Sequence, residues 1–92
     1  SETEQSQVLG QQLLIACAAG DEEKVTVLLK NPETDVNYRL PYAAMKFSSF
    51  TPLMIALAYE RPSIVPLLLK DKRLDVTLTN KNDNDALHMA VR

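Results

Sequence analysis

The side chains most often used for catalysis or metal binding are few in this chain. It has one histidine, His88, and one cysteine, Cys17, which stands in the apolar run 13–18. A reactive thiol needs a basic neighbour or a helix N-terminus, so we expect Cys17 to be a small buried apolar residue. A zinc site needs several Cys or His ligands, and a catalytic triad needs a histidine beside its nucleophile. We therefore expect neither a metal site nor a catalytic site, and no cofactor.

Two further patterns could bind charged ligands, and both are incomplete. The two glycines lie too far apart to form a phosphate-binding loop. A calcium loop begun at Asn80 would need a glycine where Asp85 stands and a closing glutamate where Val91 stands. We therefore interpret residues 77–84 as a polar hairpin tip rich in turn-forming side chains.

The charge and hydropathy of the chain narrow the classes of partner. The formal net charge is −2 and the pI is about 5.3, whereas a nucleic-acid binder usually carries a basic face. No apolar stretch approaches the roughly 20 residues that span a bilayer, and the polar, acidic residues 1–5 are unlike a signal peptide. One cysteine allows no internal disulfide. We predict an intracellular protein, cytoplasmic or nuclear, with no nucleic-acid partner and no membrane insertion.

The sequence repeats itself when it is shifted by 40 residues. Within residues 13–36, 10 of the 24 positions are then identical, including Leu28–Lys30 with Leu68–Lys70. A third, shorter copy begins near Leu87. The matched positions are mostly apolar or small, which is typical of units that pack on one another.

Each unit has the pattern of two short helices. In the first unit we predict helices over Gln12–Ala19 and Glu22–Lys30, with Asp21 as the N-cap of the second helix. Asn31-Pro32 ends that helix. The apolar stripe of the second helix, which we expect to be buried, consists of Val25, Leu28 and Leu29.

Prolines and a threonine mark the helices of the second unit. Thr51 is predicted to cap a helix in which Pro52 takes the first position, where a missing N–H costs nothing. Pro62 is predicted to start the next helix in the same way. Pro66 would then cost that helix one backbone hydrogen bond, so we expect a slight bend or a frayed first turn.

These residues resemble the ankyrin repeat. Phe50–Ala58 reads FTPLMIALA, and Ile64–Leu69 and Asp75-Val76 follow it; the family pattern is roughly T-P-L-H-x-A-A, then G-H-x-E-I-V-x-L-L-L, then G-A-D-V-N. The other units keep further positions of this pattern: Leu13, Ala16, Gly20, Val25, Leu28, Leu29, Asp35, Val36 and Asn37 in the first, and Leu87, His88 and Ala90 in the third. In this family the histidine position orders the turn before a helix.

The resemblance implies an all-α solenoid of antiparallel helix pairs with projecting hairpin loops, called fingers. We expect residues 1–92 to form a single domain. Its first unit is 11–50 with a long finger at 38–50, its second unit is 51–84, and a partial third unit is 85–92. We expect more repeats of a longer chain, or a second copy of the molecule, to cover the far side of the third unit.

The sequence also departs from the family pattern. Gln11-Gln12 replaces Thr-Pro in the first unit, which suits a terminal cap that faces water. Asn31–Thr34 and Asp71–Leu74 each contain one extra residue and lack the usual turn glycine, which puts the usual turn geometry in doubt. Glu60 stands where the family has its inter-helix glycine, so we expect a strained turn there.

The first finger, Tyr38–Phe50, is the largest departure. It has thirteen residues between Asn37 and Thr51, where the family needs about seven. Four of the five aromatic residues lie in it, and its net charge of +2 leaves −4 on the rest of the chain. Such a loop can bind a partner, or its apolar side chains can fold back over the repeats. Phe50, next to the Thr51 cap, is expected to be structural.

The resemblance implies a non-enzymatic module that binds another protein through its fingers and inner helices. We predict contacts at these residues: Tyr38, Arg39, Tyr42, Lys46 and Phe47 in the first finger, Asn80, Lys81, Asn82 and Asp83 in the second, and Tyr59 on the inner-helix side. The alternative is a regulatory or targeting segment of a larger enzyme, channel, transcription regulator or bacterial effector. A purely structural spacer is a third alternative.

One asparagine also fits a modification pattern of this family. A leucine eight residues before the asparagine of an Asp-Val-Asn turn resembles the recognition pattern of asparagine hydroxylases, and Leu29 and Asn37 have this spacing. Thr77 stands at the matching place in the second unit, which therefore does not fit. The other interpretation of Asn37 is a turn residue that makes hydrogen bonds.

Overall fold

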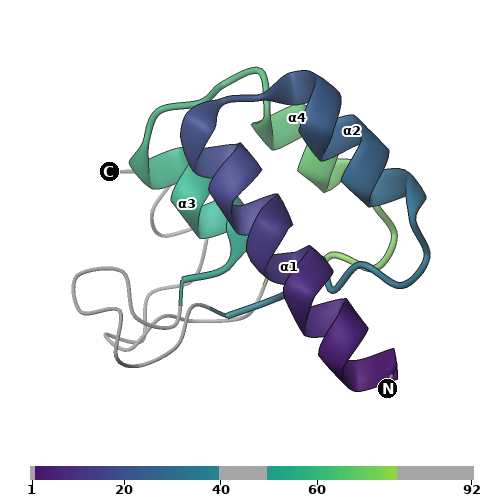
Figure 1. Cartoon of the computed structure of the whole chain (residues 1–92). Coiled ribbons are helices and arrows are strands. Elements are labelled where there is room, and N and C mark those ends of the chain that lie inside the picture. The colour runs from purple at the N-terminus through teal and green to yellow at the C-terminus, as the bar shows by residue number, and fades with distance from the viewer. Residues whose placement is uncertain (1, 40–49, 77–92) are drawn as a thin grey trace.

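A computed structural model describes residues 2–39 and 50–76 of the chain (Figure 1). These residues form the helices α1 (Glu2–Ala19), α2 (Glu22–Lys30), α3 (Pro52–Ala58) and α4 (Val65–Leu69). No strand occurs among them, and the expected all-α fold class is confirmed. The predicted third unit and most of the second finger lie in residues 77–92, outside the described residues.

The helices form two layers. α1 packs against α2 and α3, and α4 packs against α2 and α3. Figure 1 shows α1 beside α3 and α2 beside α4, so that the second helix pair stacks on the first. We call α1 and α3 the inner layer and α2 and α4 the outer layer.

The apolar core lies between these layers and includes three matched pairs of the two units: Leu13 with Leu53, Ala16 with Ala56, and Leu28 with Leu68. Its buried residues are Leu13, Leu14, Ala16, Cys17, Val25, Leu28, Val36, Phe50, Leu53, Met54, Ile55, Ala56, Ile64 and Leu68. Each fully buried leucine, isoleucine or methionine stabilises the fold by about 1.5–3 kcal/mol relative to an exposed one. Burial raises the pKa of the Cys17 thiol to about 12, which agrees with an inert core residue. The expected structural role of Phe50 is confirmed by its burial.

Helix α1 begins ten residues earlier than predicted. It starts at Glu2 rather than at Gln12, because residues 2–9 contain mostly good or neutral helix formers and no proline. Gln11-Gln12 therefore lies in the middle of a helix. Both glutamines are exposed, as a water-facing cap requires, but Val8 and Ile15 are also exposed on this helix.

The cap residues lie where the sequence predicts them. α2 spans the predicted residues, and the Asp21 carboxylate accepts a 3.1 Å hydrogen bond from the Lys24 N–H. The Thr51 hydroxyl accepts one of 3.3 Å from the Met54 N–H, and Pro52 opens α3. These bonds satisfy N–H groups that have no partner inside the helix.

Helix α4 begins at Val65, so the prediction that Pro62 starts it is wrong. Residues 62–64 form a turn in which the Arg61 carbonyl accepts hydrogen bonds from the N–H groups of Ile64 (3.0 Å) and Val65 (3.3 Å). This later start puts Pro66 in the first turn of the helix, where no intrahelical N–H bond is needed. Pro66 therefore does not cost the helix the bond that the sequence led us to expect.

The two inner helices end in the same motif. The Asp21 N–H donates to the Ala16 carbonyl (3.0 Å), and the Arg61 N–H donates to the Ala56 carbonyl (2.8 Å). This closure needs a left-handed residue just before the last donor. Gly20 has φ 75° there, and Glu60 has φ 54°. The strained turn predicted at Glu60 is confirmed, at a cost of about 1–2 kcal/mol for a residue with a Cβ.

Candidate binding surfaces and the contacts that position them

Three of the predicted partner-binding residues lie in the described part of the chain. Tyr38 is half-buried against the core, while Arg39 and Tyr59 are exposed. Tyr59 ends α3, whereas Tyr38 meets α1 at Gly10, so the structure places Tyr38 and Tyr59 toward opposite ends of the inner layer. The remaining predicted residues fall outside the described residues: Tyr42, Lys46, Phe47, Asn80, Lys81, Asn82 and Asp83.

Tyr38 fixes the start of the first finger on α1. A Cβ added at Gly10 would lie 2.6 Å from the Tyr38 Cβ and 2.9 Å from the Asp35 carbonyl oxygen. Only a residue without a side chain permits this approach, which explains a glycine inside a helix. Part of the Tyr38 ring is therefore structural, and Arg39 is the first finger residue that faces solvent.

Asn37 joins the two units through its side-chain amide. Its Nδ2 donates to the Arg73 carbonyl, and its Oδ1 accepts from the Asp75 N–H, both at 2.8 Å. Its own N–H donates to the Asp35 carboxylate at 3.0 Å. The interpretation of Asn37 as a hydrogen-bonding turn residue is thus confirmed, and its bonds reach 36 and 38 residues along the chain.

Arg73 makes the densest set of contacts between the units, and the sequence did not indicate it. Its guanidinium donates to four carbonyl oxygens of the first unit, at 2.8–3.2 Å: those of Leu29, Asn31, Pro32 and Thr34. These oxygens lie at and just beyond the end of α2, where carbonyls lack helical partners and the helix dipole is negative. Arg73 therefore caps a helix of the neighbouring unit.

Asp71 orients this guanidinium. Arg73 Nε donates to Asp71 Oδ1 at 3.0 Å, and Nη2 donates to Oδ2 at 2.8 Å. This two-pronged pair lowers the pKa of Asp71 and raises that of Arg73, in each case chiefly through the hydrogen bond between the side chains. The Asp71 carboxylate therefore stays ionised, and its charge is matched by a guanidinium within the same turn.

The two turns without glycine close through side chains. Asn31 Oδ1 accepts from the Glu33 N–H, and Asp71 Oδ1 accepts from the Arg73 N–H, both at 2.9 Å. In the first unit the Thr34 hydroxyl also donates to the Leu28 carbonyl at 2.7 Å. Asn and Asp form such turns by bonding to the backbone two residues ahead. A left-handed glycine is not required.

A second arginine joins the units at the other end of the helices. Arg61 Nε donates to the Ala18 carbonyl at 2.9 Å, and its side chain lies 3.2–3.5 Å from the Cβ position of Gly20. A side chain at position 20 would push this arginine away. The units are thus held together at both ends of their helices, by Arg61 at one end and by Arg73 with Asn37 at the other.

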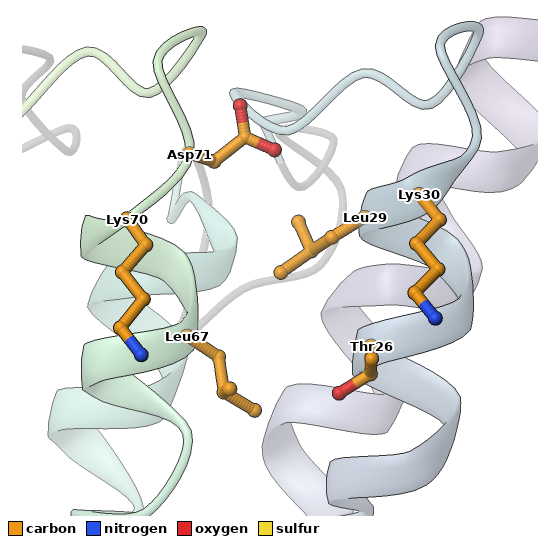
Figure 2. A pocket seen from close by; sticks show the side chains of 6 residues that line it. All are labelled: Thr26, Leu29, Lys30, Leu67, Lys70 and Asp71. Atoms are coloured by element: carbon orange, nitrogen blue, oxygen red, sulfur yellow. The ribbon is translucent and has the colours of Figure 1, made fainter.

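An open groove of about 250 Å³ lies between α2 and α4 in the outer layer (Figure 2). Leu29 and Leu67 are only partly buried, and their side chains point toward one another across it. Lys30 and Lys70 are exposed on either side of the two leucines. The sequence predicted that Leu29 would be buried with Val25 and Leu28, but it faces the groove instead. The groove lining is completed by Thr26 and Asp71.

The described residues show no arrangement suited to a metal ion. Within residues 2–39 and 50–76, no three His, Cys, Asp or Glu side chains gather as a ligand set. His88 lies outside this part of the chain. No helix within the same residues is long and apolar enough to cross a membrane.

The comparison with protein families agrees with this geometry. A family model described as ankyrin repeats (3 copies) matches residues 13–92. The match covers both described helix pairs apart from the first eleven residues of α1, and it continues through the predicted third unit.

Proposed function

Because the chain belongs to the ankyrin-repeat family, we propose that it is a non-enzymatic module that binds a partner protein through its fingers and inner helices. Ankyrin repeats are in general protein-interaction modules. The observation that carries the proposal is the start of the first finger: Tyr38 is anchored on α1, and the next residue, Arg39, faces solvent. A firmly held base reduces the entropy that a binding loop loses on association.

The proposed contacts are those that the sequence indicated, with Tyr38 serving as the anchor of the first finger on α1. Aromatic side chains and arginine supply the binding energy at the first finger, through Tyr42, Phe47 and Arg39, with Lys46 beside them. Tyr59, 43% exposed at the end of α3, and residues 80–83 of the second finger form the polar and aromatic rim. The module acts in a reducing intracellular compartment, cytoplasmic or nuclear, in keeping with its buried free thiol.

The test compares a double variant of the finger with the wild-type chain as affinity bait. Tyr42→Ala with Phe47→Ala should reduce recovery of the specific partner at least tenfold, because these are the aromatic anchors. The unfolding temperature should not change. Val27→Ala is the matched control, since Val27 is 67% exposed on the outer helix α2. Equal recovery with all three baits would reject the finger as the binding site.

The alternative function is a regulatory or targeting segment of a larger protein, whose activity lies elsewhere. The two functions differ in what removal of the segment does. A regulatory segment changes the activity of the protein that carries it when residues 1–92 are deleted. Deletion of a binding module changes only which partner proteins are recovered with the protein that carries it.

We also propose Asn37 as a substrate of an asparagine hydroxylase. The proposal rests on the Leu29 to Asn37 spacing. In the folded chain the Asn37 amide makes two 2.8 Å hydrogen bonds to the second unit, so modification requires this junction to open. Co-expression with such an enzyme should add one oxygen atom to the intact mass, and Asn37→Gln should prevent the addition. An unchanged mass of the wild-type chain would remove the proposal.

A further inference from the structure

The outer-layer groove has an apolar floor between two positive side chains. Leu29 and Leu67 face one another across it, with Lys30 on one side and Lys70 on the other (Figure 2). The lysines occupy equivalent positions, 40 residues apart, in the two units. The stacking of the units therefore places one positive charge at the end of each helix that borders the groove.

The positive charges of Lys30 and Lys70 are not paired within the described part of the chain. Neither ammonium group makes a hydrogen bond or ion pair with residues 2–39 or 50–76. A lysine at the end of a helix often compensates the negative end of the dipole, but two carbonyls in the last turn of α2, those of Leu28 and Leu29, already accept from the Thr34 hydroxyl and from Arg73. Lys30 is thus not needed as a cap.

The one acidic residue of the groove does not cancel the positive charge. Both oxygens of the Asp71 carboxylate accept hydrogen bonds from Arg73, at 3.0 and 2.8 Å. This pair is neutral as a unit, so the groove carries a net charge of +2 from its two lysines. The groove is also smaller than the roughly 300–1,000 Å³ of small-molecule pockets, and it fits a single apolar side chain better than a small-molecule ligand.

We propose that this groove binds an acidic peptide segment of a partner protein. An apolar side chain of the segment packs on Leu29 and Leu67, and a carboxylate on each side of it pairs with Lys30 and Lys70. Packed helices lie about 8–10 Å apart, and an extended chain advances about 3.3 Å per residue with alternate side chains on one face. The fitting pattern is therefore acidic-x-apolar-x-acidic, whose carboxylates start about 13 Å apart and are reached by flexible lysines.

This inference rests on the proposed function as a protein-binding module, but it concerns a different surface. The fingers and the inner layer bind in the proposal above, whereas α2 and α4 form the outer layer. Variants of the two surfaces can therefore be tested separately.

The test is an NMR titration of the isotope-labelled chain with the blocked peptide Glu-Ser-Leu-Ser-Glu. We expect the amide signals of Leu29, Lys30, Leu67 and Lys70 to shift, with a Kd of about 1 mM or tighter. Each exposed ion pair changes an affinity by about two- to fivefold, so Lys30→Gln with Lys70→Gln should weaken binding about tenfold. Lys24→Gln with Lys72→Gln is the matched control, because it removes the same charge from exposed lysines outside the groove.

The peptide can also be varied, which leaves the fold of the protein untouched. Replacing its leucine by serine should weaken binding about tenfold, through loss of the apolar contact, and replacing both glutamates by glutamine should do the same. Retained binding by the serine peptide, or tighter competition by an oligothymidine strand, would reject the apolar-acidic segment in favour of a simple anion. Absence of shifts, or an equal effect of the control lysines, would reject the groove.

Two crossed measurements separate this proposal from the proposed function. The finger variant Tyr42→Ala with Phe47→Ala should still bind the peptide with unchanged affinity, and loss of peptide binding in this variant would move the peptide to the finger. The variant Lys30→Gln with Lys70→Gln should still recover the partner that the finger binds. Failure of the groove therefore leaves the finger proposal standing, and failure of the finger leaves the groove proposal standing.

Discussion

Replacement of Arg73 by alanine should destabilise the fold more than any other surface substitution in the described residues. The wild-type guanidinium donates hydrogen bonds to carbonyls of Leu29, Asn31, Pro32 and Thr34 and forms a two-pronged pair with Asp71. Removing it leaves the Leu29 carbonyl at the end of α2 and three carbonyls beyond it without this donor, and the Asp71 carboxylate without its partner. The contact spans two units, so the loss falls on the junction that makes the fold cooperative.

The size of the effect follows from these bonds. A hydrogen bond that involves a charged group contributes about 1.5–3 kcal/mol when it is shielded from water. The Arg73 side chain is 35% exposed, so water compensates part of the loss, and five acceptors that share one guanidinium do not add up independently. The interaction of the positive guanidinium with the negative end of the α2 dipole contributes about 0.3–1 kcal/mol more. We expect a total loss of about 2–3 kcal/mol.

Chemical and thermal unfolding followed by circular dichroism measure this loss. In a domain of this size 1 kcal/mol corresponds to about 4–8 °C, so Arg73→Ala should lower Tm by roughly 10–20 °C. Arg73→Lys keeps the charge but not the planar fork, and should recover less than half of the loss. Arg39→Ala is the control, since Arg39 is exposed and makes no bond to the described residues. If Arg73→Ala stayed within about 0.5 kcal/mol of Arg39→Ala, the assignment of Arg73 as the cap of α2 would be wrong.

Four further predictions concern single residues. Gly10→Ala should lower Tm although alanine favours helices by about 1 kcal/mol, because its Cβ would meet Tyr38 at 2.6 Å; a raised Tm would contradict the close packing. Glu60→Gly should stabilise the chain by up to about 1 kcal/mol, since relief of the positive φ outweighs the flexibility of glycine in the unfolded state. Urea unfolding measures this change, and Glu33→Gly, in an exposed turn, is the comparison that should destabilise the chain. Cys17 should not react with a thiol reagent at neutral pH until the chain unfolds, because its pKa is raised to about 12 and it is buried; rapid labelling of the native chain would refute its place in the core. Because the pKa of Asp71 is lowered below its ordinary value of 3.8, mainly by the hydrogen bond from Arg73, its stabilisation should be present above pH 3.8 and disappear as the pH falls through the folded-state pKa. The stability difference between the wild type and Asp71→Asn should therefore narrow in acid, and a difference that does not change with pH would show that ionisation of Asp71 does not stabilise the fold.

The repeated pattern of the sequence predicted the helix pairs because helix caps and apolar spacing are local features of the sequence. Asp21, Thr51 and Pro52 fix helix starts through groups within three residues of them, and Val25 and Leu28 mark a buried face at helical spacing. Such signals lie within one turn of helix and can be found without a structure. For the same reason α2 was predicted to the residue.

The start of α4 and the incomplete burial of Leu29 could not be found in this way. Proline is common at a helix start, but residues 62–64 form a turn and α4 begins only at Val65. Pro66 therefore lies in the first turn of the helix. Leu29 matches the buried stripe of its own helix, yet the neighbouring helix α4 leaves it beside a groove. The start of α4 is decided by this local turn at 62–64, which the residue type of Pro62 alone does not reveal, and the position of Leu29 is decided by how one unit lies on the next.

The contacts between units were missed because they join residues that differ between the repeats. Arg73 stands where the first unit has Glu33, and Arg61 stands where it has Asp21. A comparison of the chain with itself detects only positions that are identical in the two units, so it does not detect these arginines. An arginine where the equivalent turn has an acidic residue is the signal that would have identified them, because its guanidinium can donate to backbone carbonyls of the neighbouring unit.

Arg73 also connects the two proposed binding surfaces. Its carbonyl accepts a hydrogen bond from Asn37, the residue next to Tyr38 at the base of the first finger. Its guanidinium holds Asp71 and the end of α2, which form the wall of the outer groove. Loss of the Arg73 side chain should therefore weaken peptide binding at the groove, whereas the bond from its backbone to Asn37 can persist. Replacement of Asn37 by alanine should affect the finger side instead, because it removes two hydrogen bonds beside Tyr38 and leaves the guanidinium in place. Peptide affinity and partner recovery should therefore be measured in both variants. Arg73→Ala should reduce peptide affinity at the groove, and Asn37→Ala should reduce partner recovery through the finger.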